Sequence, residues 1–154
     1  MHTSALASPA PKPDPFELSR FVLAQDLNNG QALIEIQSGQ KESCWMWYIF
    51  PQIAGLGISR TSEYYAINSK EEATAYLGHE ILGPRLRTHC EALLSLSGKT
   101  AEEIFEYPDH LKLKSSMTLF AQVTPSPSVF TQVLDQYFDG NLDLLTLERL
   151  APVE

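Results

Sequence analysis

One short stretch holds most of the unusual side chains of the chain and limits how it can fold. Residues 43–57 contain both tryptophans, two further aromatic residues and one of the two cysteines, and they close with a proline and Gly55-Leu56-Gly57. The run of apolar and aromatic residues, 44–50, is far shorter than the roughly 20 residues that a membrane-spanning helix needs. We therefore expect this stretch to lie inside a folded domain, as its core or as the wall of a pocket.

Composition narrows the class of protein. A chain of 154 residues can form one domain, and its 44% hydrophobic and 19% charged content is typical of a soluble globular protein. The net charge is −8, and the 11 Lys and Arg residues are scattered along the chain. Because nucleic acid binding needs clustered cations, no nucleic acid partner is expected, whereas a basic pocket for one small anion is compatible with the sequence.

The cysteines give no sign of a metal or of another cofactor. Cys44 and Cys90 stand apart, without the spacing of zinc ligands, and are expected to be reduced thiols in a cytoplasmic protein. No membrane partner is expected, and the oligomeric state is left open. Residues 1–13 lack the pattern of a secretory signal and are expected to form a disordered tail, with a second short tail at 151–154.

Capping signals and apolar spacing predict an all-α domain over residues 14–150, a compact multi-helix bundle around the central aromatic segment. Asp14-Pro15, Ser69 and Thr100 resemble helix starts, and Asn28-Asn29-Gly30 should break or bend the first helix. No convincing run of alternating residues predicts a strand. The expected long helices cover residues 15–27, 31–37, 70–77, 84–97, 110–123 and 127–139.

Familiar catalytic motifs are missing. The sequence contains no Gly-x-x-x-x-Gly-Lys-Ser/Thr, His-Glu-x-x-His or Gly-x-Ser-x-Gly pattern, and Gly55-Leu56-Gly57 lacks the third glycine of a dinucleotide loop. Cys44 could pair with a histidine as a nucleophile, but its tryptophan and methionine neighbours favour a small buried hydrophobe. Asp109 is interpreted first as a helix cap and second as a catalytic carboxylate.

Five segments carry a resemblance to a known family. They are residues 45–57, beginning Trp-Met-Trp-Tyr-Ile-Phe-Pro-Gln-Ile, residues 65–67, Tyr-Ala-Ile, residues 75–77, Ala-Tyr-Leu, residues 82–86, Leu-Gly-Pro-Arg-Leu, and residues 112–120, Lys-Leu-Lys-Ser-Ser-Met-Thr-Leu-Phe. From about residue 14 to 150 the chain resembles small bacterial and fungal proteins described as a domain of unknown function and often labelled calpastatin. Calpastatin is a disordered repeat protein, so that label has no physical support here. This family usually has His at the position of Cys44.

The family also looks like a distant relative of the NADAR superfamily of α-helical proteins, which act on N-glycosidic bonds of ADP-ribose derivatives. That resemblance implies a pocket for a nucleotide or ribosyl ligand and a hydrolase of the N-glycosidase type. Trp45 or Trp47 would stack on a ring, and Arg60 and Arg85 would hold phosphate. Glu63 or Asp109 would stabilise positive charge as the bond loosens. Lys114 and Ser116 complete the expected ligand contacts. The alternative is a regulatory module that binds a ligand or protein without catalysis.

Overall fold

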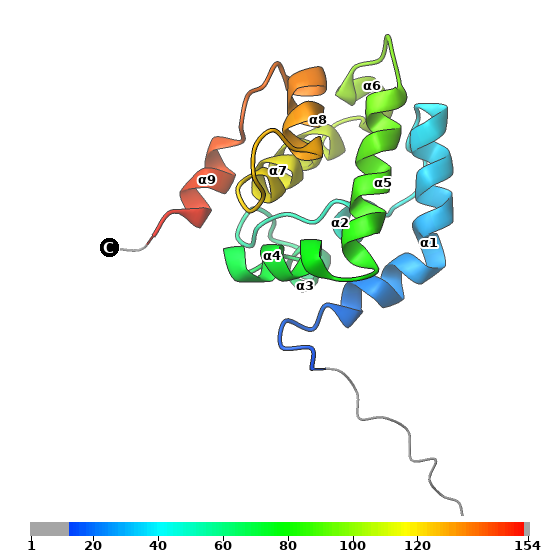
Figure 1. Ribbon diagram of the computed structural model, residues 1–154. Helices are drawn as coiled ribbons and strands as arrows, with labels where there is room; N and C mark the ends of the chain where they lie inside the picture. The colour runs from blue at the N-terminus through cyan, green and yellow to red at the C-terminus, as the bar shows by residue number, and fades with distance from the viewer. Residues whose placement is uncertain (1–12, 153–154) are drawn as a thin grey trace, which may run out of the picture.

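Helices dominate the part of the chain, residues 13–152, that this computed structural model describes (Figure 1). They are α1 (Ser19–Ser38), α2 (Met46–Ile49), α3 (Arg60–Tyr64), α4 (Lys70–Gly78), α5 (Leu82–Ser95), α6 (Ala101–Phe105), α7 (Asp109–Ala121), α8 (Val129–Phe138) and α9 (Leu144–Leu150). Within residues 13–152, a parallel bridge between Ile53 and Ile67 is the β-type pairing. The all-α prediction is confirmed. Of the tails predicted at residues 1–13 and 151–154, residues 1–12 and 153–154 lie outside the described residues.

Hydroxyl side chains set where several helices begin. Thr100 and Ser128 each form a complete capping box, so the last long helix begins at Val129 and not at the predicted Pro127. Ser69 caps α4 as expected, since its Oγ accepts from the Glu72 N–H at 3.0 Å. The Glu72 carboxylate does not complete that box, because it turns to other donors described below.

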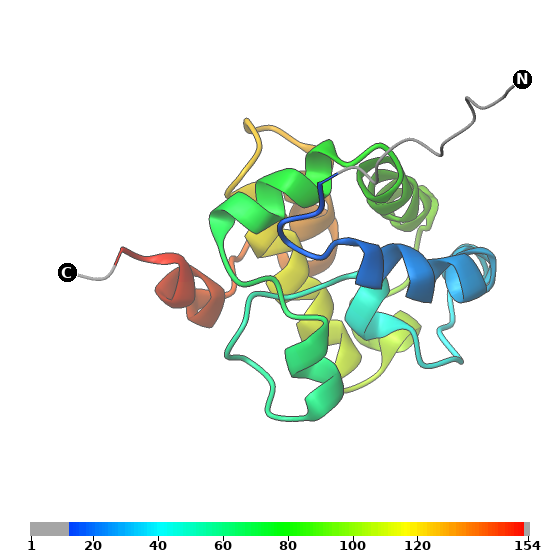
Figure 2. The same cartoon turned by 90° about the horizontal axis from the view of Figure 1, so that it is seen from below.

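The start of α1 differs from the prediction, and of the predicted break or bend in its course only a bend is seen (Figure 1). The Asp14 carboxylate accepts the backbone N–H groups of Leu18 (2.7 Å) and Ser19 (3.0 Å), so it fixes a turn ahead of the helix, which begins only at Ser19. Asn28-Asn29-Gly30 does not end the helix. It continues to Ser38, and its axis changes direction along its length in both views (Figures 1 and 2).

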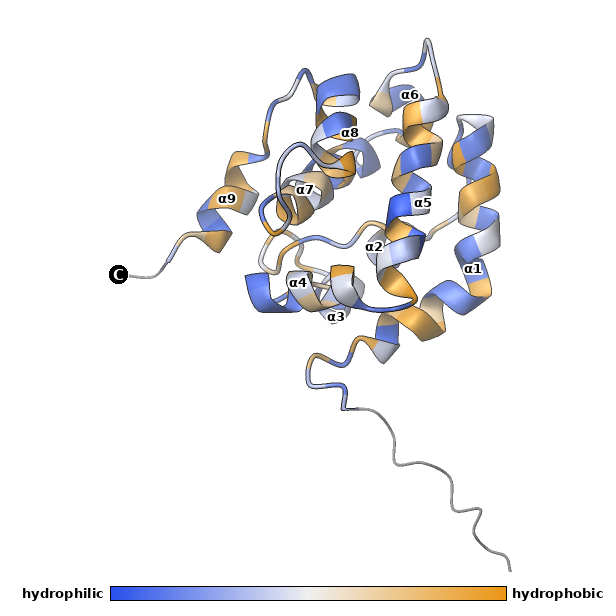
Figure 3. Cartoon of the chain, viewed as in Figure 1, coloured by the Kyte–Doolittle hydropathy of each residue, from blue (hydrophilic) through white to orange (hydrophobic). Residues whose placement is uncertain are grey.

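Large aromatic side chains fill the core. Fully buried members are Phe21, Trp45, Phe50, Tyr76, Phe120 and Phe130. Within this core α7 packs against α8, α6, α9 and α4, while α5 packs against α1, α8 and α4. In contrast, α9 contacts α7 and projects from the edge of the molecule, and part of this helix is hydrophobic (Figure 3). No helix within residues 13–152 is long and apolar enough to cross a membrane.

Candidate functional site around Trp47

Trp45, one of the two residues expected to stack on a ligand, belongs to the core. Its side chain is 0% exposed, and its indole N–H donates to Glu35 Oε1 at 2.9 Å. The rings of Phe50 and Phe105 lie beside it, with centroids 6.3 and 6.2 Å away. A ring closed in on these sides offers no face to a ligand, so the structure does not fit the stacking role predicted for Trp45.

Trp47 is only half-buried and lines three neighbouring hollows. The largest is a groove of about 520 Å³, which falls in the size range of small-molecule sites. A smaller hollow of about 140 Å³ adjoins it and shares Trp47, Gln52, Gly57 and Ser62. A third hollow lies on the side of Cys44 and Tyr48. Trp47 is therefore the residue around which a ligand site can form.

The groove runs between the loop at residues 52–59, the first half of α7 and the start of α9. Trp47, Leu56, Ile58, Leu111 and Leu145 give it an apolar wall. Its polar groups come from the same elements and include Gln52, Ser59, Ser62, Lys112, Lys114, Ser115 and Asp143. An apolar wall with a few convergent polar groups is typical of a site for a small organic ligand.

Two lysines of α7, Lys112 and Lys114, line the groove and bring positive charge to it. Lys112 Nζ lies 4.9 Å from the centre of the Trp47 ring and 3.2 Å from Asp109 Oδ1. Lys114, also half-buried, forms no ion pair with any residue in the described part of the chain. An ammonium group in a groove without a partner is a ready contact for an anion.

The predicted carboxylates have different surroundings. Glu63 on α3 is exposed and lines the small hollow next to Trp47. Asp109 stands outside the three hollows, where its two oxygens pair with Lys41 (2.9 Å) and Lys112 (3.2 Å). It is not the N-cap of α7 either, since Pro108 holds that position. The structure thus brings Glu63, and not Asp109, to the candidate site.

The remaining predicted contacts divide in the same way. Arg60 lines the third hollow with Cys44 and Trp47. Arg85 lies between α1 and α5, where it pairs with Asp26 at 2.9 Å, and it lines none of these hollows. Ser116 is 0% exposed and faces the packed core, with no hydrogen bond from its Oγ within residues 13–152. Neither Arg85 nor Ser116 can therefore contact a ligand bound beside Trp47.

Four polar residues of the groove, Gln52, Lys112, Ser115 and Asp143, are not among the contacts that the sequence predicts. The local sequence around Gln52, Lys112 and Ser115 resembles an ordinary loop and an ordinary helix face. Asp143 Oδ2 accepts from Ser115 Oγ (3.1 Å) and from the Thr146 N–H (3.1 Å), which ties α9 to α7 beside the groove. No sequence signal links residues that far apart.

Cys44 is exposed, contrary to the expectation of a buried hydrophobe. No histidine lines the hollow in which it lies, within the described residues. His79 is engaged elsewhere, where its Nδ1 accepts the N–H groups of Ile81 (3.1 Å) and Leu82 (3.3 Å). A Cys-His nucleophile centred on Cys44 therefore has no support in this geometry.

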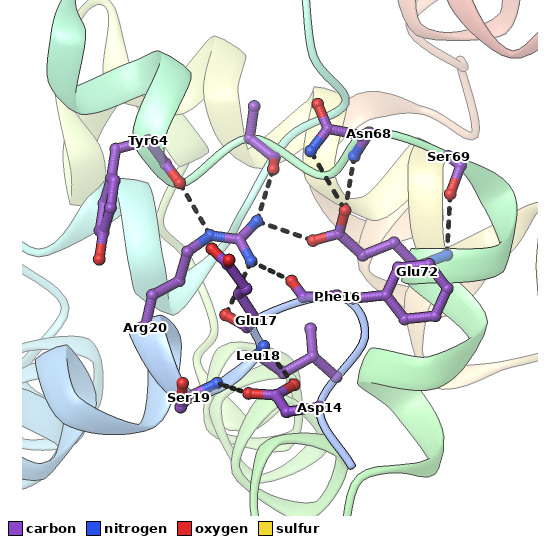
Figure 4. Close-up of polar contacts among 11 residues, drawn as sticks. Asp14, Phe16, Glu17, Leu18, Ser19, Arg20, Tyr64, Asn68, Ser69 and Glu72 are labelled. Atoms are coloured by element: carbon purple, nitrogen blue, oxygen red, sulfur yellow. Dashed lines mark hydrogen bonds and ion pairs between the residues drawn. The ribbon is translucent and has the colours of Figure 1, made fainter.

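A buried ion pair holds the segment that follows α3 (Figure 4). Arg20 on α1 donates its Nε–H to the carbonyl oxygen of Tyr64 (2.8 Å) and its Nη2 hydrogens to the Ala66 carbonyl oxygen (2.8 Å) and to Glu72 Oε2 (2.7 Å). Glu72 Oε1 accepts the backbone N–H of Asn68 at 3.0 Å. These bonds fix residues 64–68, which border the hollow that Glu63 lines.

Comparison with known proteins extends over the whole site. The model of a family described as "Protein of unknown function (DUF1810)" matches residues 15–150. The crystal structure of the conserved hypothetical protein Rv1873 from Mycobacterium tuberculosis is similar with a TM-score of 0.89 and 45% sequence identity, over 91% of this chain and 100% of that chain. The search of curated proteins found no match. Since neither description states an activity, the function has to be inferred from the groove.

Proposed function

The chain belongs to the DUF1810 family of proteins of unknown function, and we propose that it binds a small ligand with a flat ring and an anionic group, such as a nucleotide or a ribosyl phosphate, in the groove beside Trp47. One observation carries the proposal. A half-buried tryptophan and the unpaired ammonium group of Lys114 line the same groove, in a chain whose net charge is −8.

Each part of the ligand has a matching group. The Trp47 ring offers a face for stacking, which contributes about 1–3 kcal/mol per base in proteins that bind single-stranded nucleic acids. Lys114 supplies charge for a phosphate, and the Gln52 amide can donate to phosphate or sugar oxygens. The Ser59 and Ser62 hydroxyl oxygens can accept from sugar hydroxyls, because their own hydrogens are donated to Ser62 Oγ and to the Ser59 carbonyl oxygen. Lys112 already contacts both Trp47 and Asp109, so we assign it to orienting the ring rather than to the phosphate.

The finer form of the proposal is hydrolysis of an N-glycosidic bond, as the resemblance to the NADAR superfamily implies. Glu63 lines the small hollow that shares Trp47, Gln52 and Ser62 with the groove. A sugar that extends from a ring stacked on Trp47 into this hollow would meet the Glu63 carboxylate. A carboxylate there would stabilise the positive charge that develops on the sugar as the bond breaks.

A second candidate is a binding module without catalysis that recognises a protein segment. Ile58, Leu111 and Leu145 are exposed hydrophobic side chains, and all three line the groove. Exposed apolar residues gathered at one groove are typical of a site for a protein partner. In this case the groove would take apolar side chains of the partner, and Lys114 would pair with an acidic residue.

Tryptophan fluorescence tests the binding proposal. Titration with ADP-ribose, ADP and NAD should change the emission of the wild-type protein, because the ligand covers Trp47. The Trp47→Phe variant should show no change, since the remaining Trp45 is enclosed and serves as an internal control. An unchanged wild-type emission up to millimolar ligand would refute nucleotide binding at this groove.

Product analysis separates the two forms of the proposal. If the protein is a hydrolase, incubation with a bound ribosyl nucleotide should release the free base or nicotinamide, and Glu63→Gln should remove turnover while the ligand still binds. Glu91→Gln, at an exposed position on α5, is the matched control. Binding without any product, in the wild type as in Glu63→Gln, would favour the binding module.

A further inference from the structure

The helix that forms one wall of the site has no buried side chain of its own. None of the five residues of α3 is buried, and Ile58 just ahead of it is 97% exposed. Even so, Arg60, Ser62 and Glu63 of this helix each line at least one of the hollows around Trp47. Ring contacts reach α3 at its end, where Tyr64 meets Tyr65, so directed hydrogen bonds have a large part in setting the distance between α3 and Trp47.

The Arg20 guanidinium holds the end of α3. Its Nε–H donates to the carbonyl oxygen of Tyr64, the last residue of α3. One of its Nη2 hydrogens donates to the carbonyl oxygen of Ala66. The Nη1 hydrogens bond the carbonyl oxygens of Phe16 (2.6 Å) and Glu17 (2.9 Å), next to α1. With the bond to Glu72, all five N–H donors of this planar group are used (Figure 4).

Glu72 completes the arrangement from α4. It neutralises Arg20, and its second oxygen accepts the N–H of Asn68, so the segment after α3 is fixed at three points. The two side chains are only 8% and 2% exposed. A buried ion pair is often no more stabilising than apolar side chains of the same size, but its directed bonds define one geometry. This pair can therefore fix the position of the segment after α3, rather than add to the stability of the fold.

We propose that Arg20 and Glu72 are positioning residues of the ligand site: they fix α3 against Trp47 and thereby set the width of the hollows in which the ligand binds. The predicted effect on ligand affinity rests on the proposed function. The predicted effect on the position of α3 does not, because it rests on the hydrogen bonds of Arg20 and Glu72. The backbone bonds of Ile67 to Gln52 and Ala54, each 2.8 Å long, supply a second anchor, because they join the segment after α3 to the loop that precedes the helix.

Paired apolar replacement gives the sharpest test. In Arg20→Met/Glu72→Leu no charge is left unpaired in the interior, so the double variant should stay folded while the directed bonds to α3 are lost. We expect hydrogen exchange at the amides of Ser62, Glu63, Tyr65 and Ala66 to become at least tenfold faster, while exchange in α5 and α7 is unchanged. Affinity for ADP-ribose, measured by Trp47 emission, should fall at least tenfold.

Two controls keep the outcome decisive. Asp26→Ala/Arg85→Ala removes an ion pair at the surface and should change neither readout. Arg20→Lys keeps the charge but loses the fork of donors, so exchange at α3 should rise even in this milder variant, which also serves if the double variant does not fold. Unchanged exchange at α3 in a folded variant would overturn the proposal. Faster exchange at α3 in a protein that binds no nucleotide would instead support the positioning role and refute only the proposed ligand.

Discussion

Trp45 and Trp47 are separated by one residue, yet they occupy opposite kinds of environment. Trp45 is enclosed by aromatic rings and donates its indole N–H to Glu35, whereas Trp47 borders three hollows and has the Lys112 ammonium group over its ring. Residue 46 begins α2, a helix of only four residues, so the two rings leave the backbone in different directions. The comparison shows how one aromatic segment supplies a core anchor and, two residues later, a ring that borders open hollows.

Glu35 satisfies the one polar group of the buried Trp45 ring. Besides the indole, its carboxylate accepts the N–H groups of Glu42 (2.7 Å) and Ser43 (2.9 Å), the Ser43 hydroxyl (2.6 Å) and the Gln31 amide (2.8 Å). Burial alone would raise the pKa of Glu35, but these bonds to the charged form outweigh it and lower the pKa from 4.5 to about 2. Among residues 13–152, Trp47 has no comparable polar anchor.

Truncation of the two rings should give the largest contrast. We expect Trp45→Ala to lower the free energy of unfolding by about 3–5 kcal/mol, because it leaves a cavity in the core and unpairs Glu35. Trp47→Ala should cost less, about 1–2 kcal/mol, since its ring packs only against the edge of the core and also loses the contact with Lys112. Urea unfolding followed by circular dichroism measures both values. Equal losses would contradict the division of roles.

Acid should weaken the Trp45 region through Glu35. As the pH falls, this carboxylate takes up its proton at about pH 4.5 in the unfolded chain, but only near pH 2 in the folded protein. Its contribution is therefore complete above pH 4.5 and is lost as the pH falls from 4.5 toward 2, a change of about 3 kcal/mol. Urea unfolding over this pH range should show a much smaller loss for Glu35→Gln than for the wild type or for the exposed control Glu91→Gln.

Charge removal beside Trp47 should act on binding and not on stability. Lys114→Gln should weaken ADP-ribose binding about tenfold or more, because one charge-assisted bond to phosphate is lost. Lys70→Gln, on the exposed surface of α4, removes the same charge and should leave affinity unchanged. Isothermal titration at two salt concentrations checks the cause, since the wild-type affinity should depend on salt more steeply than that of Lys114→Gln. Equal effects of the two variants would show that only net charge matters.

The smallest effect is expected at Arg85, which sequence reasoning had assigned to phosphate. Its partner Asp26 lies on α1, away from the hollows around Trp47, and the pair is partly open to solvent. Arg85→Ala should cost less than about 1 kcal/mol of stability and should leave ligand affinity unchanged. A loss of affinity in the same fluorescence titration would mean that the ligand site extends to this side of the molecule.

Local sequence signals predicted the helices well and the site only in part. Caps such as Thr100 act within one turn, so they can be found from neighbouring residues, and apolar spacing located the buried sides of α7 and α8. The burial of Trp45 depends on Glu35, ten residues earlier, and the place of α3 depends on Arg20, more than forty residues earlier. Such long-range hydrogen bonds leave no periodic pattern to find.

Arg20 belongs to the first helix, while the residues that contact the proposed ligand begin at Trp47. A fragment that starts after α1 would contain every contact residue of the groove and still lack the group that fixes α3. Transplanting residues 47–145 into another scaffold should accordingly reproduce the composition of the site without its shape. The functional unit of this fold is therefore longer at its N-terminal side than its contact residues suggest.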